Sequence, residues 1–168
     1  MWAVRIETER LLLRRLSEPD ADAFAELFND PQVLRFIAVK QPYTRDDALE
    51  RIRDDVRAWD ELGQRIVAIE ERATGRFAGR VLLYDWPQFG ETEIGWTLMA
   101  DARGRGYATE AARALIEWGF ANLDVPYLVS MVNRDNEPSR RVAERLGMSV
   151  LREEELDGEP HLVYALRR

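Results

Sequence analysis

The clearest pattern of hydrophobic and polar positions in the chain is that of an amphipathic helix over residues 44–62. Apolar side chains recur there at helical spacing, while the opposite face carries charge. Thr44 and Asp47 match the signature of a capping box, and Gly63 suits the C-terminal cap. Weaker patterns predict three further helices, over residues 21–29, 108–122 and 137–146. The pair Asp30 and Pro31 is expected to end the first of these.

The segments between these helices are short apolar or alternating runs bounded by turn residues, a pattern that predicts β-strands. Glycine-containing turns at 73–75 and 157–158 join neighbouring runs into hairpins. The expected strands cover residues 10–16, 64–72, 76–84, 92–98, 127–132, 149–156 and 161–167. Hairpins interrupted by two crossover helices predict an α+β fold, with a mixed, mostly antiparallel sheet of about six or seven strands and about four helices.

Length and composition fit one globular domain over residues 1–168. Apolar residues make up 46% of the chain and charged residues 33%, and the sequence contains no repeat or linker. The longest apolar runs are too short to cross a bilayer, and the N-terminus lacks the order of a secretory signal. The absence of cysteine fits a reducing compartment. We therefore expect a cytoplasmic protein that makes no membrane contact.

Net charge and residue types narrow the chemistry. A net charge of -7 argues against a nucleic-acid binder, which needs a basic face to neutralise phosphates. It is compatible with a cationic substrate, although solubility alone explains it. Cysteine is absent and His161 is the only histidine, which excludes thiol nucleophiles and histidine-rich metal sites. We expect no metal.

The segment most suggestive of a ligand is a glycine-spaced, doubly basic loop that runs into a predicted helix. It comprises Arg103, Gly104, Arg105, Gly106, Tyr107, Ala108 and Thr109. Glycines let the backbone approach a ligand, and the first N–H groups of a helix lack internal partners and lie at its positive end. Such a loop suits a phosphate-bearing ligand. From these residues alone, a plain turn is an equally good interpretation.

Two well-known phosphate motifs fit this loop poorly. A dinucleotide fingerprint needs Gly or Ala where Thr109 stands, and it follows its strand directly, whereas residues 100–103 intervene here. A P-loop needs a Gly-Lys-Ser/Thr sequence, which does not follow. A nucleotide-binding protein stays as an alternative, and it predicts thermal stabilisation by ATP or NAD and not by CoA.

Several blocks, taken in order, resemble the GNAT superfamily of N-acetyltransferases. Residues 103–108 (RGRGYA) match the Q/R-x-x-G-x-G/A motif that binds the acyl-CoA pyrophosphate in that family. The branch that contains the bacterial ribosomal-protein (Rim-type) N-terminal acetyltransferases is similar at 8–14 (TERLLLR), 93–98 (EIGWTL), 133–139 (NRDNEPS) and 144–148 (ERLGM). The resemblance covers nearly the whole chain and is weakest over residues 36–65.

The resemblance implies a GNAT fold and a binding mode for acetyl-CoA, the expected acyl donor. In this family one strand splays from its neighbour and its exposed backbone bonds the pantetheine; the corresponding residues are Trp96, Thr97 and Leu98. The backbone N–H groups of residues 103–109 would hold the pyrophosphate, with the Arg105 side chain adding charge or remaining solvated. Asn136 corresponds to an asparagine that contacts the cofactor near its reacting end, and it also suits a helix N-cap.

The implied reaction is direct attack of a neutral primary amine on the acetyl thioester in a ternary complex. Glu93 stands where the family often carries an acid near the acceptor, so it is the expected base; a surface carboxylate is the alternative. The tyrosine that many members place seven residues after the asparagine is Ala143 here. Ser139, one helical turn after Asn136, occupies the place assigned to the sulfur in the ribosomal-protein branch, unless it only bonds backbone in the first turn.

The amine acceptor stays open between a protein or peptide N-terminus and a small amine. At neutral pH roughly a tenth of α-amino groups, but only a few lysines per ten thousand, are already unprotonated, which favours an N-terminus. One alternative is an aminoglycoside or polyamine acetyltransferase. Another is a non-catalytic acyl-CoA-binding or regulatory protein, which the loss of the tyrosine at Ala143 would fit. Either a monomer or a homodimer is compatible with the sequence.

Overall fold

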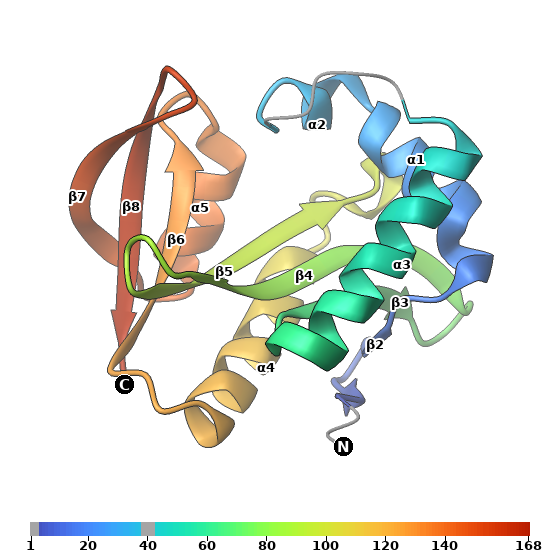
Figure 1. Ribbon diagram of the computed structural model, residues 1–168, viewed down its shortest axis with the longest axis horizontal. Helices are drawn as coiled ribbons and strands as arrows, with labels where there is room; N and C mark the ends of the chain where they lie inside the picture. Colours follow the sequence, from blue (N-terminus) through green and yellow to red (C-terminus); the bar gives the residue numbers. More distant parts are fainter. Residues whose placement is uncertain (1–3, 38–42) are drawn as a thin grey trace.

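The computed structural model describes residues 4–37 and 43–168, which build one mixed β-sheet with helices on both faces (Figure 1). The strand order is β1-β2-β3-β4-β5-β6-β8-β7. All neighbours are antiparallel except β5 and β6, which are parallel. The strands are β1 (Ile6–Glu7), β2 (Leu11–Arg15), β3 (Arg65–Glu71), β4 (Arg76–Trp86), β5 (Glu91–Leu98), β6 (Tyr127–Asn133), β7 (Ser149–Leu156) and β8 (Glu159–Arg167).

The helices divide between the two faces of the sheet. They are α1 (Ala21–Asn29), α2 (Pro31–Leu34), α3 (Arg45–Leu62), α4 (Tyr107–Asn122) and α5 (Glu137–Arg145), with short 3-10 turns η1 (Glu18–Asp20) and η2 (Ala100–Ala102). A Cβ on Gly119 of α4 would meet the Leu83 side chain of β4 at 2.9 Å. Arg80, on the opposite side of the same strand, lies over the Phe28 ring of α1 at 4.6 Å. Helices α1 and α3 therefore cover one face, and α4 covers the other together with α5, which it contacts.

The expected α+β fold and mixed sheet are confirmed, and the sheet has one or two strands more than predicted. The described residues contain eight strands and five α-helices. Strand β1 is only two residues long, too short for any periodic pattern. Helix α2 was missed because Asp30-Pro31 was interpreted only as a helix end. Pro31 is in fact the first residue of a new helix, where no backbone N–H is needed, and the Asp30 side chain caps it by accepting from Gln32 N at 2.8 Å.

The capping predicted for the longest helix is confirmed at both ends. The Thr44 hydroxyl accepts from the backbone N of Asp47 at 3.1 Å, and the Asp47 carboxylate accepts from the backbone N of Thr44 at 2.7 Å. Gly63 ends α3 in the left-handed region at φ 71°. The apolar face of α3 buries Ala48, Ile52 and Trp59 against the sheet and α1.

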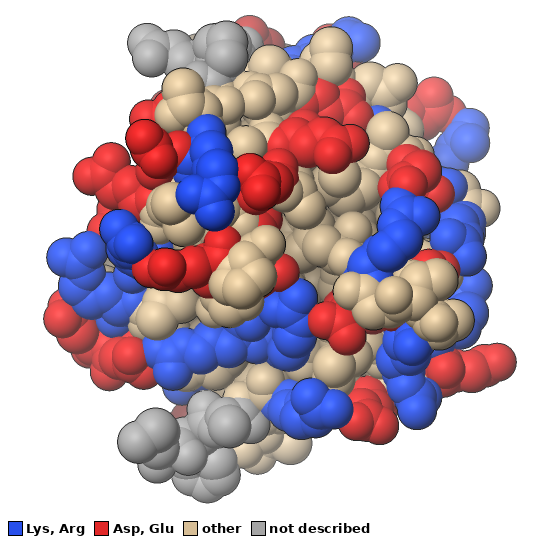
Figure 2. All heavy atoms as spheres, turned by 90° about the vertical axis from the view of Figure 1, so that its right-hand side faces the viewer, with Lys and Arg blue, Asp and Glu red and all other residues tan. Residues whose placement is uncertain are grey.

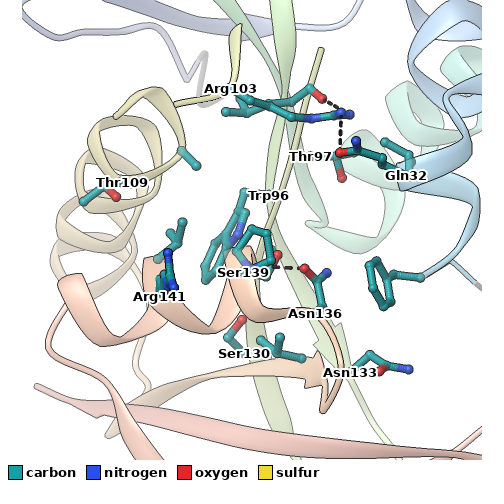
Figure 3. Close-up of a pocket in the computed structure, with 18 of the residues that line it drawn as sticks. Gln32, Trp96, Thr97, Arg103, Thr109, Ser130, Asn133, Asn136, Ser139 and Arg141 are labelled. Carbon is teal, nitrogen blue, oxygen red and sulfur yellow. Dashed lines mark hydrogen bonds between the residues drawn. The ribbon is translucent and has the colours of Figure 1, made fainter. Parts of the chain in front are cut away.

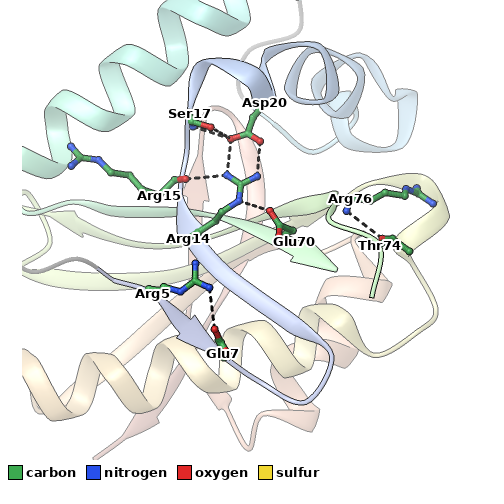
Figure 4. A network of polar contacts seen from close by, with 9 residues as sticks. All are labelled: Arg5, Glu7, Arg14, Arg15, Ser17, Asp20, Glu70, Thr74 and Arg76. Atoms are coloured by element: carbon green, nitrogen blue, oxygen red, sulfur yellow. Dashed lines mark hydrogen bonds and ion pairs between the residues drawn. The ribbon is translucent and has the colours of Figure 1, made fainter. Parts of the chain in front are cut away.

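A buried ion network fastens β2 to its surroundings (Figure 4). The Arg14 guanidinium donates to both carboxylate oxygens of Asp20 at 2.8 and 2.9 Å and to Glu70 at 2.6 Å. Burial alone would raise the pKa of Asp20, but the hydrogen bonds from Arg14 and Ser17 bring that pKa below its ordinary value. The network joins β2, η1 and β3, so β2 is held by ion pairs as well as by its ladders with β1 and β3.

The sheet opens between β5 and β6. The parallel ladder pairs Glu93 with Val129, and toward their C-terminal ends the two strands diverge (Figure 1). Strand β5 keeps its full antiparallel ladder with β4 on the other side. The backbone of its last residues is therefore exposed toward the opening, which is the splayed arrangement that the resemblance implied.

The approach of β4 to β5 depends on a glycine. Gly79 of β4 adopts φ 147°, and a Cβ there would lie 2.2 Å from the carbonyl oxygen of Thr97. A side chain at this position would push β5 away from β4, next to the opening.

The surface carries mixed charge. On the face shown in Figure 2, basic and acidic side chains are interspersed. None of the helices in the described ranges is long and apolar enough to span a membrane.

Candidate active site

A cavity of about 670 Å³ occupies the opening between β5 and β6 (Figure 3). Most of its walls come from five places that are distant in sequence: α2 and the turn after it, β5, the loop before α4 with the first turn of that helix, the second half of β6, and α5; Leu82 of β4 and His161 of β8 complete the lining. The splayed strands make the cavity, because side chains and backbone of both strands face a space that no ladder fills.

The loop before α4 is shaped to receive an anion. Gly104 and Gly106 adopt φ 73° and 78°, values that glycine takes without strain. Gly106 occupies the N-cap of α4 without any side-chain cap. Within the described residues, the N–H groups of residues 104–109 have no hydrogen-bond partner. A turn of unpartnered donors at the positive end of a helix fits the pyrophosphate of an acyl-CoA.

The loop is braced from outside the cavity. The Arg105 side chain pairs with Glu71 at 2.8 Å and lies over the Tyr107 ring, and Arg10 donates to the Arg105 carbonyl at 2.8 Å. The Tyr107 hydroxyl also donates to Glu71. Hydrogen bonds from Tyr107 and Thr74, with the nearby Arg105 charge, lower the pKa of Glu71 to about 2. The side chains of Arg105 and Tyr107 thus hold the loop, and backbone N–H groups remain for a ligand.

The Arg103 side chain crosses the top of the cavity toward α2 (Figure 3). Its guanidinium donates to Asp30, to Gln32 and to the carbonyl of Leu98 at 2.8, 3.0 and 3.0 Å. These partners leave the backbone of Arg103 as the part of this residue nearest to a ligand in the loop. Ala108 and Thr109, in the first turn of α4, also line the cavity.

The end of β5 forms the floor of the opening. Trp96, Thr97 and Leu98 all line the cavity, and the Trp96 ring extends between α4 and α5 (Figure 3). The Leu98 carbonyl is taken by Arg103. Their predicted contacts with pantetheine stay a prediction, which the geometry permits.

Asn136 and Ser139 lie on the wall opposite β5, at the start of α5 (Figure 3). The Asn136 side chain caps α5 by accepting from the backbone N of Ser139 at 3.3 Å. The Ser139 hydroxyl has no hydrogen-bond partner among the described residues, so it is free to donate to a ligand. Ala143, in the same helix, is fully buried and packs in the core.

Glu93 is a half-buried carboxylate that lines the cavity. It lies at the point where β5 and β6 part, with one oxygen accepting from Trp86 Nε1 at 2.7 Å and the other from the backbone N of Met131 at 3.2 Å. Burial raises the pKa of Glu93, although these two hydrogen bonds and the Arg80 charge oppose the shift. A carboxylate held in this way is a better base than an exposed one.

Sequence reasoning missed the wall contributed by α2. Gln32, Val33, Phe36 and Ile37 line the cavity. The signal was present in the Asp30-Pro31 pair, which marks a helix start as readily as a helix end.

His161, expected to be an ordinary strand residue, also lines the cavity. It lies in β8 opposite Asn133 of β6, another lining residue. The pairing of β6 with β8, which are separated by helix α5 and strand β7, gave no signal in the sequence.

The chain is similar to acetyltransferases over most of its length. Residues 10–149 match the model of the acetyltransferase (GNAT) domain. A Bacillus subtilis protein described as an uncharacterized N-acetyltransferase, YnaD, is 30% identical over 86% of this chain and 82% of its own. YdaF of the same organism, described as a putative ribosomal N-acetyltransferase, is 28% identical over 83% of this chain and 78% of its own.

Solved structures agree with this assignment. The crystal structure of an acetyltransferase from Agrobacterium tumefaciens is 34% identical, superposes with a TM-score of 0.81, and covers 100% of this chain and 96% of its own. Except for His161, the residues that line the cavity, the loop before α4 among them, lie within the stretch that the family model matches. The chain therefore belongs to the GNAT acetyltransferases, which take their acetyl group from acetyl-CoA.

Proposed function

We propose that the protein acetylates the primary amine of a peptide N-terminus or a small amine, with Glu93 as the proton acceptor. The observation that carries the proposal is the position of Glu93: a half-buried carboxylate, fixed by two hydrogen bonds, at the point where the splayed strands part and in the same cavity as the loop. A base there would lie near the reacting end of a donor whose phosphates occupy the loop.

The donor side rests on backbone groups. Bound acetyl-CoA supplies the acetyl thioester, whose carbonyl carbon is attacked by the amine. The unpartnered N–H groups of residues 104–109 would bind its pyrophosphate, and the exposed backbone of β5 would orient its pantetheine. Alignment of this kind is worth up to about 7–11 kcal/mol, so the loop and β5 would contribute more to the rate than any one side chain.

Glu93 would remove the proton that the amine must lose. The raised pKa of Glu93 is closer to the pKa of an ammonium than the pKa of an exposed glutamate is, and this makes proton transfer easier. An α-ammonium group, with a pKa of about 7.7–8.0, gives up its proton to such a base more easily than a lysine ammonium, with a pKa of about 10.4. This difference supports an N-terminal amine.

Ser139 would stabilise the departing sulfur. Its hydroxyl has no hydrogen-bond partner in the described part of the chain, and Asn136, one turn earlier, lines the same wall. A serine is a weak acid, but a thiol with a pKa near 8.5 leaves readily enough for a hydrogen-bond donor to suffice. The buried Ala143 offers no hydroxyl, so Ser139 is the better candidate on this helix.

The α2 wall supports an acceptor with an uncharged body next to its amine. Val33, Phe36 and Ile37 are apolar, as is Leu82, which lies opposite Gly95 of β5. An aminoglycoside or polyamine carries several charges, and burying each of them requires its own partner. The similarity to a putative ribosomal N-acetyltransferase agrees with a peptide N-terminus.

The test is release of free thiol from acetyl-CoA in the presence of an acceptor panel. The panel contains peptides with apolar first residues, the same peptides with blocked N-termini, polyamines and aminoglycosides. We expect thiol release above hydrolysis only with unblocked peptides or small monoamines. Tight CoA binding with silence across the panel would favour a non-catalytic acyl-CoA-binding protein, and turnover of polyamines or aminoglycosides alone would overturn the proposed acceptor class.

A further inference from the structure

Arg103 joins two parts of the cavity that are distant in the sequence, the loop before α4 and helix α2. Its guanidinium makes an ion pair with Asp30 at 2.8 Å and hydrogen bonds to Gln32 and the Leu98 carbonyl, both at 3.0 Å. The side chains of Arg103 and Asp30 are 29% and 16% exposed. A charge-assisted contact so far withdrawn from solvent is stronger than a surface ion pair.

The Asp30 end of this contact controls the placement of α2. One Asp30 oxygen caps the helix through Gln32 N, and the other takes Arg103. The backbone N of Val33 and that of Leu34 also bond the Asp30 carbonyl, at 3.0 and 2.9 Å. Helix α2 is only four residues long, and so short a helix does not hold itself in place. Its position therefore depends on anchors such as Arg103.

The other end of the contact lies in the cofactor loop. Gly104, the first glycine of the unpartnered turn, follows Arg103 directly. A movement of the loop backbone would also move the Cα of Arg103, whose guanidinium is held by three partners. On the α2 side those partners are Asp30 and Gln32, and Gln32 lines the cavity.

We propose that Arg103 is a positioning residue, which holds the α2 wall of the acceptor site in register with the cofactor loop, so that donor binding organises acceptor binding. Its side chain acts through Asp30 and Gln32 and not on the phosphate. The statement that α2 lines the acceptor site rests on the proposed function. Rigidifying one part of a site by occupying another is a form of positive coupling between ligands.

The test is hydrogen exchange with and without acetyl-CoA, which needs no acceptor. In the wild type, acetyl-CoA should slow exchange both at residues 104–109 and at the backbone amides of α2. In Arg103→Ala the loop should still be protected, while protection of α2 is lost. A hydrogen bond to a charged group is worth enough to change opening by about tenfold or more, so the loss is measurable.

Asp30→Asn separates positioning from capping. Asparagine caps a helix as well as aspartate does but lacks the charge that pairs with Arg103. Under the proposal this variant loses much of the α2 protection although its cap is intact, and Arg103→Lys restores part of what alanine removes. With a peptide acceptor, Arg103→Ala should raise the KM for the peptide by about tenfold, with little change in kcat or in CoA affinity.

Arg76→Ala is the matched control. Arg76 pairs with Asp101 in η2, the turn that precedes the same loop, and within the described residues it has no hydrogen bond or ion pair with α2. It should leave α2 protection at the wild-type level. Protection of α2 that survives in both Arg103→Ala and Asp30→Asn, or that never forms in the wild type, overturns the proposal whether or not an acceptor has been found. Silence with every acceptor would refute the proposed function alone.

Discussion

The contact between Glu91 and Arg152 offers the sharpest test of how the opened sheet is held together. Arg152 of β7 donates to both carboxylate oxygens of Glu91 of β5, at 2.7 and 2.8 Å, and the Tyr127 hydroxyl of β6 donates to the same carboxylate at 3.2 Å. The Glu91 side chain is 5% exposed. We predict that Arg152→Ala destabilises the protein strongly, because it leaves a buried carboxylate without its cation.

Removing one partner of a buried ion pair costs about 3–5 kcal/mol, and because Arg152 is itself 31% exposed we expect less than this, about 2–3 kcal/mol. For a chain of this size that lowers Tm by about 4–12 °C. Urea unfolding at pH 7 measures the free energy directly. The surface pair of Arg53 and Glu18, with both side chains 61% exposed, supplies the control: Arg53→Ala should cost less than about 1 kcal/mol.

The pH dependence gives a second check of the same reasoning. Arg152 lowers the pKa of Glu91, so the stability that the pair contributes is present above the ordinary carboxyl range and is lost as pH falls through the lowered value. In Arg152→Ala burial without a cation favours the protonated carboxyl instead. The gap in stability between wild type and variant should therefore narrow toward pH 4. A cost below about 1 kcal/mol at pH 7, or a gap independent of pH, would refute the argument.

Three further predictions concern the site and the strand beside it. Glu93→Gln should lower turnover by about a hundredfold or more, while the dissociation constant for CoA stays within about twofold. Because burial raises the pKa of Glu93, wild-type activity should rise with pH above the ordinary carboxyl range, and the variant should lose this rise. Unchanged turnover would remove Glu93 from the mechanism. Ser139→Ala should lower turnover by about tenfold with unchanged CoA binding by calorimetry, and an equal loss of binding would point to a role in holding the donor. Gly79→Ala should destabilise the protein by about 2 kcal/mol or more in urea, since its Cβ would meet the Thr97 carbonyl, and it should also weaken CoA binding; an unchanged midpoint would mean that β5 yields freely.

The sequence was sufficient to predict those elements whose ends are marked by residues within the element itself or directly beside it. The bounds of α1 were predicted to the residue, and Thr44, Asp47 and Gly63 marked the ends of α3 correctly. These features depend on neighbours in the chain, so a single sequence carries them. The resemblance added the order of the blocks and the splayed strands, which hydrophobic periodicity alone does not contain.

What the sequence could not predict depends on contacts between distant segments. The α2 wall meets the cofactor loop through Asp30 and Arg103, 73 positions apart, and His161 reaches the cavity only because β8 pairs with β6. That the Ser139 hydroxyl lacks a partner within residues 4–37 and 43–168 is likewise a property of the assembled site. Pairing between such positions is set by tertiary packing, for which local patterns give no sign.

The position of His161 determines how binding to this enzyme is observed most simply. The chain contains one histidine, and that histidine lines the cavity, so an NMR spectrum of imidazole carbons holds one native signal located at the site. Its Nδ1 faces the carbonyl oxygen of Glu159 at 2.9 Å; a carbonyl only accepts, so in the neutral ring the proton lies on Nδ1 and Nε2 presents a lone pair. A candidate amine that enters the cavity would shift this signal without labelling, mutation or turnover.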